Sequence, residues 1–373
     1  MTDTARALSF LTIDVDAVVA NWRRLAALIA PAEAAAVVKA DCYGLGVEHI
    51  APALAAAGCN SFFVATVDEG IQLRHLVPGA VIYVLGGPLP GSEPDFAAHR
   101  LVPVLNSLAQ ITGWSSFAKV GSAAPAAALH LDTGMNRLGL EEKELERLVA
   151  KPDVLTSIRP ILAMSHLACA DDAESPKNAE QLALFRRLSA MLPAMPLSLS
   201  ASGGMFLGRS YRFDMARPGA ALYGLNPIPD QPNPMSQVVR LQGKILQVRD
   251  VDSPMTVGYG ASHRIARRGR IATVATGYAD GWFRSLGKRG FGFIEGIKVP
   301  VVGRISMDLT TFDVSEIPET LARPGALVEL IGPHQSADDV ALAAGTIGYE
   351  VLTALGRRHH RRWLLGARGG VAE

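Results

Sequence analysis

The first 225 residues alternate between amphipathic stretches and short apolar runs. From Asp16 to Ala30 the apolar residues Val18, Trp22 and Leu25 recur at helical spacing, which predicts a helix. Strand-like apolar runs then lie at 34–39, 62–65, 81–85, 101–104, 126–131 and 161–165, with weaker candidates at 197–200 and 213–217. Runs that are apolar on both faces suit parallel strands covered by helices. We therefore predict an α/β domain over residues 1–225, built as a TIM-like (β/α)8 barrel, with a doubly wound open sheet as the alternative.

The pattern changes after Tyr223. Four prolines fall within residues 226–234, which predicts a linker because proline lacks an N–H donor and restricts the residue before it. Beyond the linker, short β-branched runs at 244–248, 270–274 and 299–302 are divided by glycine turns, and one helix is expected at 336–344. These features predict a second, mainly-β domain over residues 235–373, and the first ten residues or so are candidates to pair with it.

Composition restricts the class of partner. The 36 basic and 35 acidic side chains leave a net charge of +1, which disfavours nucleic acid or an anionic membrane and favours a small ligand. The basic run 357–362 is expected to face solvent rather than to bind phosphate. The three cysteines fit neither a disulfide framework nor a metal site, and neither a signal peptide nor a membrane span is apparent. We expect a cytoplasmic protein without a metal.

Candidate chemistry gathers at the ends of the predicted strands. In a parallel barrel the working residues lie at the carboxyl ends of strands, and five side chains fall there: Lys39, Arg137, His166, Ser202 and Arg217. Desolvation of Lys39 would lower its pKa below ~10.4 and make it a nucleophile suited to a Schiff base. The glycines that follow Ser202 offer N–H groups to a phosphate. Taken singly, each residue also suits a structural role: a solvent-facing strand end, a core histidine, a surface arginine or a helix N-cap.

Eight ordered stretches carry a resemblance to a known family: 37–46, 132–139, 165–168, 217–219, 258–260, 277–281, 303–308 and 345–350. Over essentially its whole length the chain resembles the bacterial alanine racemases, fold-type III enzymes that depend on pyridoxal 5'-phosphate. The resemblance implies that Lys39 carries this cofactor and that His166 packs against its ring. It also implies that the phosphate is held by Tyr43, Ser202, Gly219 and Tyr349.

The resemblance further places Arg217 beside the pyridine nitrogen of the cofactor. A permanent cation there resists protonation of that nitrogen and weakens the ring as an electron sink. A short-lived carbanion favours return of the proton over transamination, so Arg217 argues for racemisation. Decarboxylases built on the same barrel typically place an acid at this position.

Inversion of an α-carbon requires acid/base groups on both faces of the substrate. The resemblance implies Lys39 on one face and Tyr259, from the second subunit of a head-to-tail homodimer with shared active sites, on the other. Arg137 and the backbone N–H of Met307 are the implied partners of the substrate carboxylate, while Tyr278 and Tyr349 are candidates to narrow the entrance. The expected reaction interconverts L- and D-alanine, either for peptidoglycan or in alanine breakdown. The alternatives are a broad-specificity racemase, a decarboxylase and a non-catalytic carrier of the cofactor.

Three positions depart from the family pattern. His130 stands where many members have a lysine, carbamylated in some, that orients the arginine matching Arg137; we hypothesise that His130, a bound anion or another group takes over this task. Ala201 replaces an asparagine before the phosphate-binding serine. The loop after Lys39 has Asp41, Cys42 and Leu45 in place of the common Asn, Ala and His.

Overall fold

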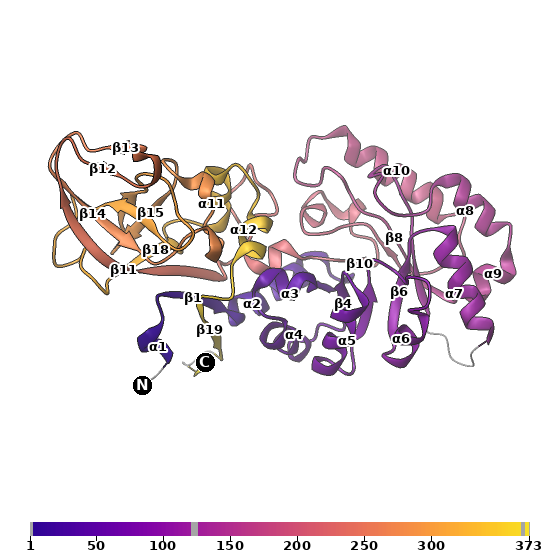
Figure 1. The fold of residues 1–373 in the computed structure, drawn as a ribbon. Coiled ribbons are helices and arrows are strands. Elements are labelled where there is room, and N and C mark those ends of the chain that lie inside the picture. The colour runs from indigo at the N-terminus through magenta and orange to yellow at the C-terminus, as the bar shows by residue number, and fades with distance from the viewer. Residues whose placement is uncertain (1–2, 121–125, 367–369, 373) are drawn as a thin grey trace. The chain divides into compact units, whose positions relative to one another are not determined.

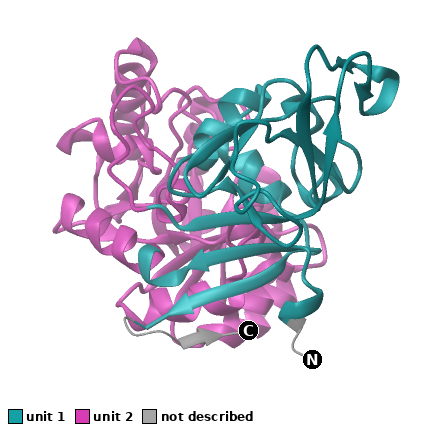
Figure 2. Cartoon of the chain, turned by 90° about the vertical axis from the view of Figure 1, so that its left-hand side faces the viewer, with its two compact units in different colours: residues 1–17, 237–373 teal, residues 18–236 magenta. Residues whose placement is uncertain are grey.

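The computed structural model describes residues 3–120, 126–366 and 370–372. The chain forms two compact units (Figure 2), the barrel unit of residues 18–236 and the β unit of residues 1–17 and 237–373. The sequence predicted domains at 1–225 and 235–373. In the structure the N-terminal strand β1 (Ser9–Asp14) belongs to the β unit, where it pairs with β11 (Val239–Val251) and β19 (His360–Leu365).

Seven parallel strands of the barrel unit pair in chain order (Figure 1). They are β3 (Ala36–Val37), β4 (Ser61–Val64), β5 (Val81–Val84), β6 (Leu101–Leu105), β7 (Ala127–His130), β8 (Pro160–Met164) and β9 (Leu197–Ser198). Every residue of β4 and β6 is buried, which explains why these runs are apolar on both faces.

The eighth strand closes the ring. On one side β10 (Met215–Ala216) pairs with β2 (Glu33–Ala34), and β2 continues through Ala35 into β3. On the other side the N–H of Arg217 donates to the carbonyl of Ser200 at 2.8 Å, and the N–H of Asp214 donates to the carbonyl of Leu197 at 3.0 Å. The predicted (β/α)8 barrel is therefore confirmed, and the open-sheet alternative is wrong.

Helices alternate with these strands as the periodicity predicted. They are α2 (Val15–Ile29), α4 (Val47–Ala56), α5 (Val67–Leu76), α6 (Glu93–Ala98), α7 (Leu108–Val120), α8 (Glu142–Val149), α9 (Pro152–Ser157) and α10 (Pro176–Ser189). One expectation needs correction: the strand predicted at 34–39 ends at Val37. Lys39 instead begins the short segment α3 (Lys39–Gly44), whose residues Ala40 to Tyr43 have left-handed backbone angles.

The β unit is built around a nine-stranded sheet. Besides β1, β11 and β19 it contains β14 (Gly269–Val274), β15 (Phe291–Ile294), β16 (Ile297–Pro300), β17 (Thr310–Asp313), β18 (Leu327–Ile331) and β20 (Gly370–Ala372). An irregularity between Ile245 and Gln247 divides β11, whose first half pairs with β1 and β18 and whose second half pairs with β14. The mainly-β character predicted for this part of the chain is confirmed.

Smaller elements complete the β unit. A hairpin of β12 (Thr256–Val257) and β13 (His263–Arg264) lies apart from the main sheet. The predicted helix is α11 (Ala337–Ala344), capped by Ser336, whose Oγ accepts the N–H of Asp339 at 3.1 Å. A second helix, α12 (Gly348–Ala354), was not predicted. Within the described residues, no helix has the length and apolar composition needed to cross a membrane.

Arg74 joins the segments that enter two barrel strands. Its buried guanidinium donates to five backbone carbonyls, those of His99 (2.9 Å), Val77 (3.3 Å), Pro78 (3.1 Å), Ala80 (2.7 Å) and Arg100 (2.8 Å). These carbonyls lie where α5 leads into β5 and α6 leads into β6. The contacts therefore hold the amino ends of the strands, the face of a barrel that is usually concerned with stability.

We predict that Arg74→Lys lowers the free energy of unfolding by about 2–4 kcal/mol, because an ammonium cannot reach five separate carbonyls and leaves buried acceptors unpaired. Urea unfolding followed by circular dichroism measures this loss. Arg24→Lys, at an exposed position of α2, is the matched control and should change stability by less than about 0.5 kcal/mol. Equal losses in the two variants would contradict the role given to Arg74.

Candidate active site

The structure divides the ten predicted site residues between the two units. Seven lie in the barrel unit: Lys39, Tyr43, Arg137, His166, Ser202, Arg217 and Gly219. Five of these follow strand ends, Lys39 after β3, Arg137 after β7, His166 after β8, Ser202 after β9 and Arg217 after β10. Because the strands are parallel, the carboxyl-end rim of the barrel carries all five. Tyr259, Met307 and Tyr349 lie in the β unit.

Lys39 precedes a turn of unusual backbone geometry. The four consecutive residues Ala40 to Tyr43 have φ between 53° and 58°. For a residue with a side chain this conformation costs roughly 1–2 kcal/mol, so a run of four persists only where other contacts enforce it. The N–H of Cys42 donates to the carbonyl of Val38 at 3.0 Å, and the Asp41 carboxylate accepts the N–H of Val47 at 2.7 Å. The turn is thus fixed at both ends.

The surroundings of Lys39 favour its neutral amine. Burial lowers the pKa of Lys39 below its ordinary value, the positive charge of Arg137 lowers it further, and the negative charge of Glu69 opposes the change. Arg137 is itself exposed and therefore accessible to a ligand. A larger fraction of the amine is then available as a nucleophile at neutral pH.

His166 lies among several cations. Burial lowers the pKa of His166 to about 3, and the charges of Arg217, Arg137 and Lys39 add to the effect. These four side chains therefore lie within electrostatic range of one another at the rim. His166 is neutral at pH 7, and a neutral imidazole suits contact with the face of a flat aromatic ligand.

Arg217 is a buried cation without an acidic partner among the described residues. Its guanidinium donates to Ser198 Oγ, to the carbonyl of Ser165 at 2.5 Å and to the carbonyl of Leu199 at 3.4 Å. It also lies 5.9 Å from the centre of the Phe63 ring. Burial lowers the pKa of Arg217 to about 9, which still leaves the group charged at pH 7. A buried charge supported only by neutral dipoles is costly and indicates a functional role.

Tyr43, Ser202 and Gly219 meet at one corner of the rim. Ser202 Oγ accepts the N–H of Gly219 at 3.1 Å and that of Ala221 at 3.2 Å. With two N–H groups accepted, the hydroxyl hydrogen of Ser202 is left for an acceptor such as a phosphate oxygen. A Cβ at position 219 would collide with the Tyr43 hydroxyl, so the glycine permits this close approach.

Asn106 fixes the tautomer of His130. The Nδ2 of Asn106 donates to the carbonyls of Leu85 (3.0 Å) and Val104 (2.9 Å), so its Oδ1 faces His130 Nδ1 at 2.8 Å as an acceptor. The Nδ1 of His130 therefore carries the hydrogen. Burial lowers the pKa of His130 to about 4, with a further contribution from the charges of Arg217 and Arg137. His130 is thus a neutral ring whose Nε2 is an acceptor.

The three predicted residues of the β unit are exposed. Tyr259 is 71% exposed, Met307 53% and Tyr349 46%. Tyr259 lies in a turn bounded by Gly258 (φ 78°) and Gly260 (φ 69°), and the guanidinium of Arg304 packs against Gly260. These side chains are available to a ligand or to another protein chain.

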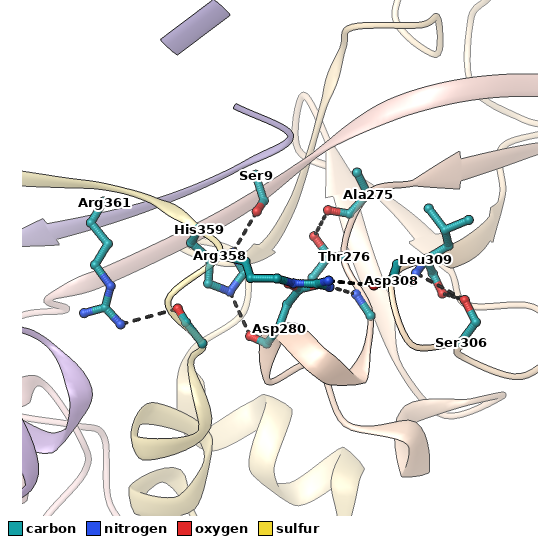
Figure 3. A network of polar contacts seen from close by, with 12 residues as sticks. Ser9, Ala275, Thr276, Asp280, Ser306, Asp308, Leu309, Arg358, His359 and Arg361 are labelled. Atoms are coloured by element: carbon teal, nitrogen blue, oxygen red, sulfur yellow. Dashed lines mark hydrogen bonds and ion pairs between the residues drawn. The ribbon is translucent and has the colours of Figure 1, made fainter. Parts of the chain in front are cut away.

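A polar network holds the loop that carries Met307 (Figure 3). Arg358 donates through Nε to Asp280 at 2.7 Å and through Nη1 to Asp308 at 2.7 Å, which ties residues 277–281 to residues 306–309. Backbone bonds join the same segments, because the N–H of Ala279 donates to the carbonyl of Met307 at 3.0 Å. Met307 is therefore held through its own carbonyl, which accepts the N–H of Ala279, and through the next residue, Asp308, which is paired with Arg358.

The structure corrects one part of the expectation that the basic run 357–362 faces solvent: Arg357 and Arg358 are exposed as expected, but His359 is buried. His359 is buried between Ser9 Oγ and the carbonyl of Asp280, both at 2.8 Å, and Arg358 is engaged by two carboxylates. The acidic partners lie 78 and 50 residues earlier in the chain, so no local sequence signal pointed to them.

Family and structural matches agree over both units. The family model for the alanine racemase N-terminal domain matches residues 13–227, and the family model for the C-terminal domain matches residues 238–363. The alanine racemase of Rhodospirillum rubrum is 52% identical over 99% of this chain and 98% of that protein. The catabolic alanine racemase of Mesorhizobium japonicum is 47% identical over 97% of this chain and 95% of that protein.

Solved structures show the same fold. A crystal structure of alanine racemase from Bartonella henselae with covalently bound pyridoxal phosphate matches with a TM-score of 0.93 at 42% identity, covering 96% of this chain and 100% of that one. The biosynthetic alanine racemase of Pseudomonas aeruginosa matches with a TM-score of 0.90 at 31% identity, covering 96% and 100%. With both units matched over nearly their full length, the chain belongs to the alanine racemase family.

Proposed function

We propose that this chain is a pyridoxal-phosphate-dependent alanine racemase that interconverts L- and D-alanine by a two-base mechanism. The observation that carries the proposal is Arg217, a buried cation without an acidic partner in the described barrel rim. When the cofactor is bound, Arg217 would lie beside its pyridine nitrogen and would disfavour the protonated ring on which strong electron withdrawal depends. That electrostatic setting suits proton removal and return, and it disfavours transamination and decarboxylation.

The residues of the rim fit the cofactor. Lys39 offers an amine whose pKa is lowered, Ser202 offers a hydroxyl hydrogen beside Gly219 and Tyr43, and His166 offers a neutral ring. The Bartonella henselae relative carries pyridoxal phosphate covalently bound. When bound, the cofactor would supply a conjugated ring that stabilises negative charge at the substrate α-carbon.

The proton is moved by two groups on opposite faces of the substrate. Lys39 serves one face, and Tyr259 of a partner subunit serves the other, in a head-to-tail homodimer whose active sites are shared. The exposure of Tyr259 supports a role toward another chain. Tyr349, which is also exposed in the β unit, would complete the phosphate site from there.

Substrate recognition depends on the α-carboxylate. Arg137 and the backbone N–H of Met307 would bind it, and the Arg358 network would keep Met307 in place. The acceptor Nε2 of His130 would orient the Arg137 guanidinium, a task for which its neutral, fixed tautomer is suited. Because position 130 is a histidine and not a lysine, the carbamate found there in some family members cannot form in this chain.

The cellular setting follows from chemistry and relatives. We propose a cytoplasmic enzyme, supported by three cysteines that are all free thiols. Matching relatives include enzymes named biosynthetic and catabolic, so D-alanine supply for peptidoglycan and alanine breakdown are both compatible roles. A broad-specificity racemase of the same fold is the alternative, and initial rates with serine, lysine and alanine distinguish the two.

The principal test combines absorbance of the purified protein with a polarimetric assay of L-alanine. We expect a cofactor band that Lys39→Ala abolishes together with racemisation, because no other residue takes the place of the attached amine. Arg24→Lys is the control and should retain both signals. Carbon dioxide release from an amino acid would instead identify a decarboxylase.

The two-base arrangement is tested by Tyr259→Phe in deuterated water. With one face left without a base, racemisation should fall by at least a factor of about 10³, while one enantiomer of alanine still exchanges its α-hydrogen with retention. Proton NMR measures exchange and a chiral assay measures inversion. Full racemisation by this variant would remove Tyr259 from the mechanism.

The phosphate corner is tested by Gly219→Ala. The new Cβ would meet the Tyr43 hydroxyl, so we expect the dissociation constant for pyridoxal phosphate to rise by at least about tenfold, measured by fluorescence titration of the cofactor-free protein. Gly79→Ala adds a methyl group where nothing lies within 4 Å and is the matched control. Unchanged affinity in Gly219→Ala would place the phosphate elsewhere.

A further inference from the structure

Glu69 connects the ends of two neighbouring barrel strands. It lies in the first turn of α5, and its Oε1 accepts the N–H of Ala40 at 2.8 Å while its Oε2 accepts the N–H of Ala65 at 2.7 Å. Ala40 directly follows Lys39, and Ala65 directly follows β4. One carboxylate therefore links the first left-handed residue of the Lys39 turn to the end of the neighbouring strand β4.

The position of Glu69 in its helix makes this use unusual. A glutamate three residues after an N-cap commonly accepts the N–H of the N-cap residue itself. Here Thr66 is the N-cap, and its Oγ1 accepts the N–H of Glu69 at 3.3 Å, but the Glu69 carboxylate reaches away from the helix to Ala65 and Ala40. The helix thus presents the carboxylate to the rim.

The contact falls on a strained element. Ala40 is the first of the four left-handed residues after Lys39. Hydrogen bonds from N–H groups to an ionised carboxylate are roughly twice as strong as those between neutral groups, so this one is well suited to hold the first residue of such a turn. The direction in which the Lys39 side chain leaves the backbone depends on that residue staying in place.

We propose that Glu69 is a positioning residue of the racemisation reaction, which aims the Lys39 amine by holding the N–H groups of Ala40 and Ala65. The inference rests on the proposed role of Lys39 in cofactor attachment and proton transfer. The charge of Glu69 acts on the same amine: it raises the pKa of Lys39, whereas burial and Arg137 lower it. Geometry and charge are therefore two separable contributions of one side chain.

Glu69→Gln removes the charge and leaves one acceptor oxygen for two N–H groups. We expect kcat to fall by between about tenfold and a hundredfold, the range for misplacement of a catalytic group. In the direction in which Lys39 takes the proton, the acid limb of the kcat profile should move to lower pH, because loss of the negative charge lowers the pKa of Lys39. Asp68→Asn, an exposed charge removal on the same helix, is the matched control and should change neither.

A second measurement does not depend on activity. Amide hydrogen exchange of the cofactor-free protein over residues 36–46 should be at least about tenfold faster in Glu69→Gln than in the unaltered protein, and unchanged in Asp68→Asn. Glu69→Asp keeps the charge but shortens the reach, so it should lower kcat without moving the acid limb. This variant also serves if Glu69→Gln does not fold.

The outcomes separate this inference from the proposed function. If the unaltered protein neither attaches the cofactor nor racemises alanine, the proposed function fails, and exchange over residues 36–46 still tests the hold on the turn. If it racemises alanine but Glu69→Gln behaves as Asp68→Asn does in kcat and in exchange, the inference is wrong. A lower kcat with unchanged exchange would also overturn it, because the turn would then have been held without Glu69.

Discussion

Closure of the barrel is the constraint on which the site depends. Two-residue strand β10 is bonded to β2 on one side and, through the Arg217 and Asp214 N–H groups, to the β9 segment on the other. A closed ring of parallel strands must present all its carboxyl ends at one rim. Residues separated by nearly 180 positions, Lys39 and Arg217, therefore share one site. In an open sheet the first and last strands would lie at opposite edges.

The rim that results carries an excess of positive charge. Arg217, Arg137 and Lys39 are close enough for their charges to depress the pKa of His166. Cations that are crowded and partly desolvated are stabilised when anions bind among them. A ligand with a phosphate and a carboxylate would compensate the repulsion among these cations, whereas a neutral ligand would leave that repulsion in place. The electrostatics of the rim therefore favour an anionic ligand, in keeping with the proposed function.

Periodicity predicted most of the architecture because local burial determines it. The runs at 62–65 and 101–104 became β4 and β6, which are fully buried, and the spacing of Val18, Trp22 and Leu25 became α2. The rule that working residues of a parallel barrel follow the carboxyl ends of its strands correctly placed Lys39, His166 and Arg217 on one rim. The supporting residues were missed because their partners are distant in sequence: Glu69 lies 29 residues from Ala40, and Asn106 lies 24 residues from His130. The left-handed turn was missed because three of its four residues, Ala40, Cys42 and Tyr43, are types that rarely adopt this conformation.

The contacts that could not be predicted from the sequence also explain how the Lys39 turn is held at the rim. Lys39 stands before a turn that is unfavourable residue by residue, so its geometry must be imposed by neighbours rather than by its own propensity. The imposing groups are polar: the Glu69 carboxylate of α5, which accepts the N–H of Ala40, and the carboxylate of Asp41 in the turn itself, which accepts the N–H of Val47. In the proposed reaction, a lysine that receives a proton at one face of a flat ligand would gain from such restraint, because a flexible side chain would spend much of its time turned away from the α-carbon. The contacts that enforce the strained turn are thus the same contacts that fix the direction of the Lys39 side chain.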